Sequence, residues 1–109
     1  MAFVDDVIDL ITAEVTHIGL SEDGETEYSG GSYEALVPSY AAAVSGEADL
    51  VESLEFEGVA NDGPITHFIL KRDAEEWKFV QVGEPKSFNS DGRLDLTSAA
   101  ITAAVVVGD

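Results

Sequence analysis

Two short apolar runs separated by an acidic turn constrain the fold of this chain more than any other feature. Residues 65–72 and 77–82 are rich in Ile, Phe, Trp and Val, and residues 73–76 between them contain three acidic side chains. β-Branched and aromatic residues in runs of this length favour strands, and a short polar segment between two such runs favours a turn. The sequence therefore predicts an antiparallel hairpin.

Further strand signals occur along the chain, separated by turn residues. The run 34–40 contains Pro38, which cannot donate a hydrogen bond to a ladder, so this strand is expected at a sheet edge or at a bend. Leu94 and Leu96 alternate with charged residues and are expected to face the core. The remaining predicted strands are 15–21, 53–57 and 101–107.

An amphipathic helix is predicted near the N-terminus, over residues 3–14. Its apolar residues recur at three- and four-residue spacings, and acidic residues lie near its start, where a helix dipole favours negative charge. With about six or seven short strands after it, the chain is predicted to be mainly β. The expected architecture is one antiparallel β-sandwich domain over residues 15–109, preceded by the helix at residues 1–14.

The charge of the chain is unusual, because 22 Asp and Glu residues stand against 5 Lys and Arg, for a net charge of -17. A mean hydropathy of +0.07 and clear apolar runs argue against a disordered acidic segment. Repulsion of this size opposes folding in ordinary buffer, but about 1 M salt shortens the Debye length to roughly 3 Å. The composition therefore predicts a folded protein adapted to concentrated salt.

The basic residues are confined to residues 71–93, where five acids balance them, and the first 70 residues hold fifteen acids and no base. Nucleic acids and anionic membranes are bound through basic patches, so neither is expected as a direct partner. The acidic N-terminus does not resemble a secretory signal, and no apolar run reaches the length of about 18 residues that spans a bilayer. The expected partners are therefore proteins.

Candidate catalytic and metal-binding residues are few, since the chain has no cysteine and no HExxH, GxSxG, phosphate-loop or EF-hand pattern. His17 and His67 each follow a threonine in a predicted strand. They are either half-buried strand residues held by their neighbours or, as the alternative, a metal site or general base of a small enzyme. We expect no enzymatic activity, no catalytic, cofactor or metal residues, and no cofactor. Non-specific hydrated cations can gather at the densest acidic group, which comprises Glu22, Asp23, Glu25 and Glu27.

The order of short motifs along the chain resembles a family of tailed-virus proteins described as tail fibre or head decoration proteins. The motifs are Thr-His-Ile-Gly-Leu at 16–20, Glu-Tyr-Ser-Gly-Gly-Ser-Tyr at 27–33, Ile-Thr-His-Phe-Ile-Leu at 65–70 and Pro-Lys-Ser-Phe-Asn-Ser-Asp-Gly at 85–92. The family members are poor in acidic residues and have a longer loop after the first strand. This chain therefore resembles an acidic version, suited to a virus of a salt-loving archaeon.

The resemblance implies a structural virion protein, namely a capsid decoration or turret subunit that forms a trimer or pentamer. Its partners would be further copies of itself and other virion proteins such as the major capsid protein. Such a subunit is made in the host cytoplasm and resides in the virion, on the capsid surface or the tail. A tail fibre or tail appendage subunit and a free intracellular protein-binding module of a halophile are the alternatives.

The predicted N-terminal helix is the segment expected to contact other subunits or the capsid. Its apolar surface is larger than one small sandwich needs to cover, and exposed apolar surface of this kind marks interfaces. The alternative is that the helix simply packs on its own sandwich. The residues expected at the contact are Phe3, Val4, Val7, Ile8 and Ile11.

Overall fold

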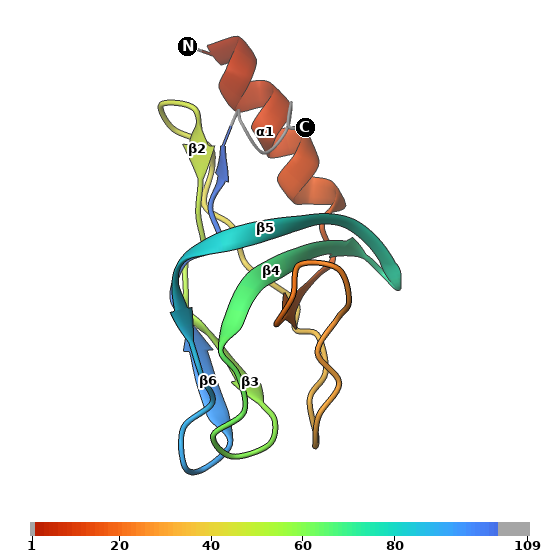
Figure 1. The fold of residues 1–109 in the computed structure, drawn as a ribbon. Coiled ribbons are helices and arrows are strands. Elements are labelled where there is room, and N and C mark those ends of the chain that lie inside the picture. The colour runs from red at the N-terminus through yellow and green to blue at the C-terminus, as the bar shows by residue number, and fades with distance from the viewer. Residues whose placement is uncertain (1, 103–109) are drawn as a thin grey trace.

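The structure, a computed structural model, describes residues 2–102 and contains one helix followed by seven strands (Figure 1). Every strand pair in it is antiparallel, and the buried apolar residues form one core. A mainly β, single-domain fold with one N-terminal helix is therefore confirmed. The elements are α1 (Ala2–Glu14), β1 (His17–Ser21), β2 (Glu47–Ala48), β3 (Leu54–Glu57), β4 (Ile65–Arg72), β5 (Glu75–Lys86), β6 (Arg93–Leu96) and β7 (Ile101–Thr102).

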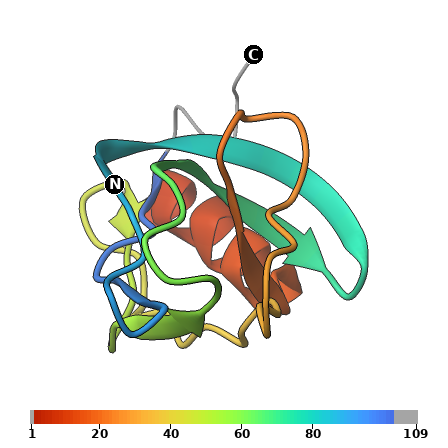
Figure 2. The same ribbon diagram turned by 60° about the horizontal axis from the view of Figure 1, so that its bottom comes forward.

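The main sheet has three strands in the order β1-β4-β5, so β4 lies in its middle. Phe68 of β4 lies in the core, whereas its neighbour Ile69 points to the opposite face of the sheet and is nevertheless fully buried. A loop over residues 22–36, the covering loop, crosses this outer face (Figure 2). It lies so close that a Cβ atom added to Gly19 would be 2.7 Å from a carboxylate oxygen of Glu27. Burial on both faces explains why residues 68–70 in the middle of β4 are apolar without alternation.

Two small sheets complete the domain, because β3 pairs with β6 and β2 pairs with β7. Phe56 of β3 is buried against the core, and so are Leu94 and Leu96 of β6, as predicted. Exposed charged residues occupy the alternate positions of both strands. The three sheets enclose the common core in a sandwich-like arrangement.

Helix α1 packs against the end of the domain formed by β2 and β7. Ile8 is fully buried in the common core. The carboxylate of Asp9 accepts a hydrogen bond from the backbone N–H of Ala43, and that of Asp5 accepts one from Gly46, each at 2.8 Å. Acidic residues near the start of the helix therefore also hold the turn that leads into β2, which joins the helix and the sheets into one unit.

The predicted hairpin is present, and its second strand is longer than predicted. β4 has the predicted bounds, while β5 extends beyond residues 77–82 at both ends. The turn needs only Asp73 and Ala74, because Asp73 adopts a left-handed conformation with φ at 55°, which Asp tolerates better than most residues. Pro85 is accommodated because β5 is an edge strand of the sheet.

The strand predicted over residues 34–40 is wrong. Among these residues only Leu36 and Tyr40 form bridges, and both bridges are isolated. Pro38 lies between them and has no N–H to donate, so a continuous ladder does not run through the segment. The segment nevertheless lies along a sheet edge, since Leu36 bridges β1.

Two other predicted strands have different limits. β1 begins at His17 rather than at residue 15, because the backbone N–H of Val15 still donates to the carbonyl of Ile11 in the last turn of the helix, at 3.1 Å. β7 confirms the start of the predicted strand 101–107. The remainder of that strand lies outside the described residues.

Candidate functional site

The two histidines lie on the main sheet but are not brought together. His17 is opposite Lys71 in the register of β1 and β4, while His67 is opposite Ser21. Four strand positions separate the two sites, which corresponds to about 13 Å. Each imidazole Nδ1 is within hydrogen-bond distance of the hydroxyl of the preceding threonine, at 2.9 and 2.8 Å. In the described part of the chain, no group of three or more His, Asp or Glu side chains is placed to hold a metal ion.

The acidic group at residues 22–27 is used partly to build its own loop. One carboxylate oxygen of Asp23 accepts hydrogen bonds from the backbone N–H groups of Glu25, at 2.8 Å, and Thr26, at 2.9 Å. These bonds favour the ionised form and lower the pKa of Asp23 to about 2. Glu27 forms an ion pair with a residue of β4. Two of the four acidic residues of the group therefore stabilise the loop.

The helix residues predicted to contact other subunits occupy different environments. Ile8 lies in the core and Ile11 packs against it, so both stabilise the chain's own fold. Val7 is partly buried. Leu10, which the sequence pattern did not select, is 68% exposed. A contact between the helix and another subunit stays a prediction. The side chains outside the described residues include Phe3 and Val4.

One edge of the main sheet, that of β1, is closed by the covering loop. Ile18 and Leu36 exchange two backbone hydrogen bonds, at 2.7 and 3.0 Å. The N–H of Leu20 donates to the hydroxyl of Tyr33, at 2.8 Å, and the carbonyl of Leu20 accepts from the N–H of Tyr28, at 2.7 Å. The outward backbone groups of Ile18 and Leu20 therefore all have partners, and another strand cannot pair there.

A small buried network anchors the covering loop to β4. The carboxylate of Glu27 accepts hydrogen bonds from the ammonium of Lys71, at 2.6 Å, and from the hydroxyl of Tyr33, at 2.5 Å. The side chains of Lys71 and Glu27 are only 11% and 20% exposed. Burial, followed by the hydrogen bond to Glu27, raises the pKa of Tyr33 far above that of a free phenol. The three groups satisfy one another away from water, which fixes the loop.

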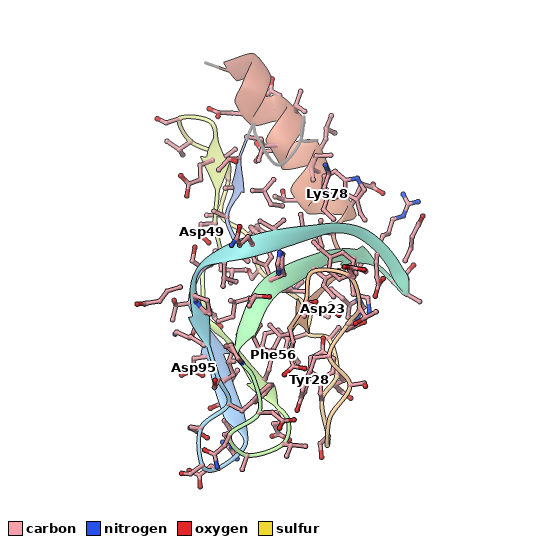
Figure 3. All side chains as sticks on the ribbon, viewed as in Figure 1. Asp23, Tyr28, Asp49, Phe56, Lys78 and Asp95 are labelled. Atoms are coloured by element: carbon pink, nitrogen blue, oxygen red, sulfur yellow. The ribbon has the colours of Figure 1, made fainter. Side chains whose placement is uncertain are left out.

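Aromatic rings hold the covering loop against the lower half of the domain. The ring of Tyr28 stacks on Phe88, with 5.0 Å between centroids, and meets Tyr33 edge-on at 5.3 Å. Tyr33 in turn lies nearly parallel to Phe56 at 6.0 Å. The hydroxyl of Tyr28 donates to Asp62 at 2.9 Å. Figure 3 shows Tyr28 and Phe56 between the covering loop and β3, so the loop is fixed to both the main sheet and the β3–β6 sheet.

The opposite edge of the main sheet, that of β5, is open. Antiparallel pairs alternate between hydrogen-bonded and non-hydrogen-bonded positions. Because Ile18 bonds outward, its pair with Leu70 is non-hydrogen-bonded, and the pair of Leu70 with Lys78 is hydrogen-bonded. The backbone groups of Phe79 and Gln81 therefore point away from β4. Within the described residues no strand pairs with this side of β5, and β5 runs along the outside of the sheet in Figure 2.

A groove of about 450 Å³ lies between β5 and β6. Val80 and Val82 line it from β5, and Leu94 and Leu96 line it from β6. The ammonium of Lys86 reaches across from β5 and donates to the backbone carbonyl of Asp95 in β6, at 3.2 Å. The groove offers apolar contacts along with hydrogen-bonding groups, and neither histidine lines it.

The charge along the chain is balanced only around the open edge. All five basic residues fall within residues 71–93 together with five acids, and β5 occupies the middle of this stretch. A second chain that approaches elsewhere meets an excess of carboxylates, so electrostatic repulsion between copies is smallest along β5. Ion pairs join Lys71 to Glu27, Arg72 to both Glu14 and Glu75, and Arg93 to Glu55.

The sequence singled out residues 27–33, with a glycine pair between Tyr28 and Tyr33, only as one of the motifs that carry the resemblance. It did not foresee that these tyrosines close the edge of β1. A usable signal was present, because Lys71 is one of only five basic residues and lies at the end of a run of buried residues. A lysine in such a position requires a carboxylate partner from elsewhere in the chain.

Comparisons of the chain with protein-family models, with curated proteins and with solved structures found no match. Within the described residues, the helix is neither long enough nor apolar enough to cross a bilayer. The main distinguishing features of the chain are therefore the closed edge of β1 and the open edge of β5, the distribution of charge, and the order of motifs.

Proposed function

We propose that this chain is a structural subunit of a virus particle, a capsid decoration or turret protein of a tailed virus that infects a salt-loving archaeon. The observation that carries the proposal is the contrast between the closed edge of β1 and the open edge of β5. A small domain of this kind offers backbone hydrogen bonds to another chain on one defined side and protects the other side. The order of motifs along the chain supports assignment to a virion.

The treatment of buried polar groups also favours a structural role. Among the described residues, no buried side-chain nitrogen or oxygen lacks a hydrogen-bond partner. Active sites commonly hold titratable groups in unusual environments where they remain available to a substrate. Here the phenol of Tyr33, whose pKa is raised by burial, is occupied in holding Leu20 and Glu27. These contacts stabilise the fold, which supports a structural role.

The acidic surface fits a source with concentrated salt. The chain carries a net charge of -17, and its self-repulsion is screened as the salt concentration rises. We expect the melting temperature, measured by circular dichroism, to fall steeply when multimolar salt is dialysed away. An unchanged melting temperature across that range would contradict adaptation to salt.

The direct test of the proposal uses purified virus particles from the source of the chain. An antibody raised against the full chain should label many sites per particle in electron micrographs, and particles of an unrelated virus serve as the control. Label on the capsid surface agrees with a decoration or turret subunit, whereas label confined to the tail corrects the location to a tail appendage. Absence of the chain from particles would contradict the proposal and favour a free binding module.

A further inference from the structure

We infer that β5 of one copy pairs with β5 of a second copy, antiparallel and around a two-fold axis. The two three-stranded sheets would then join into one continuous sheet across the interface. This contact differs from the helix contact expected from the sequence and from the threefold or fivefold symmetry implied by the resemblance. It does not depend on the virion assignment, since it follows from the geometry and charge of β5.

The backbone of β5 supplies the first argument. The N–H and carbonyl groups of Phe79 and Gln81 point away from β4, and among the described residues no strand bonds to them. A row of unpaired groups on a strand is a template for another strand. The ladder is limited at one end, because Pro85 has no N–H to donate. The open edge therefore accepts a short partner strand centred before Pro85.

The side chains of β5 select the register. The ladder between β4 and β5 shifts register after Gln81, so β4 does not hold residues 82–84 in line with the rest of β5. With the two-fold axis at Gln81 and residues 82–84 aligned along the partner strand, Gln81 faces its own copy, Val80 faces Val82 of the second copy, and Lys78 faces Glu84. Apolar and opposite-charge pairs directly across a ladder are both favourable. With the axis at Lys78, two ammonium groups would face each other. With the axis at Val80, Lys78 would face Val82 and lose its acidic partner. The register centred on Gln81 is therefore favoured.

The overall charge supplies the second argument for a copy of the chain as the partner. Each copy carries a net charge of -17, so two copies repel strongly over most of their surfaces. β5 is the exception, because its three acids are nearly balanced by its two bases. It contributes both members of the Lys78–Glu84 pair. An interface along β5 thus meets the least repulsion available to a second copy.

The first experiment tests the backbone contact. Light scattering over a range of concentrations should give the full chain a mass of twice 11.5 kDa. Gln81→Pro removes an outward N–H without removing a bond to β4, and we expect it to give a monomer with an unchanged circular dichroism spectrum. Gln81→Thr is the matched control, because it changes the side chain, keeps the N–H and should remain a dimer.

The second experiment tests the register and does not depend on whether Gln81→Pro folds. At the lowest salt that preserves the native spectrum, Glu84→Lys should weaken the dimer about tenfold, because it replaces two opposite-charge pairs by like-charge pairs. Multimolar salt should reduce this effect by screening. The double variant Lys78→Glu with Glu84→Lys should restore the dimer. Glu52→Lys makes the same charge change on an exposed bend and should not weaken the dimer.

The outcomes distinguish pairing through β5 from a monomer and from contact through another surface. Loss of the dimer in Gln81→Pro or Glu84→Lys, with recovery in the double charge exchange, supports pairing through β5. A monomer at every salt and protein concentration overturns it. An oligomer of any size that withstands both the Gln81 and the Glu84 substitutions also overturns it and moves the contact to another surface, such as the helix.

Discussion

Along β1, the outward backbone groups of Ile18 and Leu20 are bonded by the covering loop, whereas along β5 the corresponding groups of Phe79 and Gln81 have no strand beside them among the described residues. The two edges belong to the same small sheet and are only one strand apart. The two edges differ because the covering loop bonds to the outward backbone groups of β1, whereas no segment among the described residues does so along β5.

The comparison shows where the scarce basic residues are used. Lys71, one of five, is largely buried and ties the covering loop to β4 through Glu27. The open edge lies in the stretch where the charges cancel. An open edge can pair with a second copy only where the two copies do not repel each other strongly, and the closed edge lies beside the acidic covering loop. The edge that is open for pairing is therefore also the one where the charge of the chain is most nearly balanced.

The largest effect on stability is expected from removing the cation that anchors the covering loop. Lys71→Met keeps an apolar stem of similar length and leaves the carboxylate of Glu27, which is 20% exposed, without its partner. Removing one member of a largely buried pair should lower the free energy of unfolding by about 2–4 kcal/mol. Denaturant unfolding in multimolar salt, followed by circular dichroism, measures the change.

Lys86→Met is the matched control on the β5 side. Lys86 is exposed, and its ammonium donates to the backbone carbonyl of Asp95. The same substitution there should change the free energy of unfolding by less than about 0.5 kcal/mol. Equal losses in the two variants would remove the contrast between the edges.

A smaller loss is expected from Tyr33→Phe, which keeps the ring and removes the hydroxyl. The N–H of Leu20 then has no acceptor and Glu27 loses a donor, which should cost about 1–3 kcal/mol. Tyr40→Phe is the comparison, because the hydroxyl of Tyr40 donates to the carbonyl of Ala99 and does not contact the covering loop's Glu27 network. If Tyr40→Phe destabilised the protein more than Tyr33→Phe, the covering loop would not depend on this hydroxyl.

High pH should open the covered edge. Burial raises the pKa values of Tyr28, Tyr33 and Tyr40, which are all the tyrosines of the chain. The folded protein holds these protons while the unfolded chain releases them near its ordinary pKa of about 10. Stability is therefore complete below that pH and falls above it. Absorbance should show tyrosinate appearing together with loss of the circular dichroism signal, whereas ionisation of all three before unfolding would contradict this.

The smallest effect is expected at low pH, from the turn that begins the covering loop. The pKa of Asp23 is lowered from 3.8 to about 2, so its stabilisation is complete above the ordinary value and is lost as the pH falls toward the lowered one. Melting temperatures of the parent chain should decline more steeply over that interval than those of Asp23→Asn. Parallel declines would show that the turn does not contribute.

Local patterns in the sequence were sufficient for most of the elements, but not for the segment 34–40, for β2 or for the sheet edges. The apolar alternation of Leu94 and Leu96 and the hairpin of β4 and β5 depend on neighbouring residues, and both are confirmed. Pro38 was interpreted as the mark of a strand at a sheet edge or at a bend, yet its segment forms no strand and the proline that lies in an edge strand is Pro85. A proline shows that a position tolerates the loss of an N–H, and several kinds of segment meet that condition.

The closed edge could not be predicted because its contacts are distant in sequence. Glu27 meets Lys71 across 44 residues, and Tyr28 meets Asp62 across 34. Each partner alone looks like an ordinary surface or turn residue, and the pairing arises only when the loop crosses the outer face of the sheet. Which helix residues face outward also depends on tertiary packing, since Ile8 is buried in the core and Leu10 is an exposed apolar residue.

The contrast between the edges is tested most directly by hydrogen exchange of single backbone amides at low and high protein concentration. The amides of Ile18 and Leu20 should be protected at both concentrations, because the covering loop bonds them within one copy. Those of Phe79 and Gln81 should exchange quickly in dilute solution and become protected as copies pair. Protection of the β5 amides that is already complete in dilute solution, or that never changes with concentration, would contradict an edge held open for a second copy.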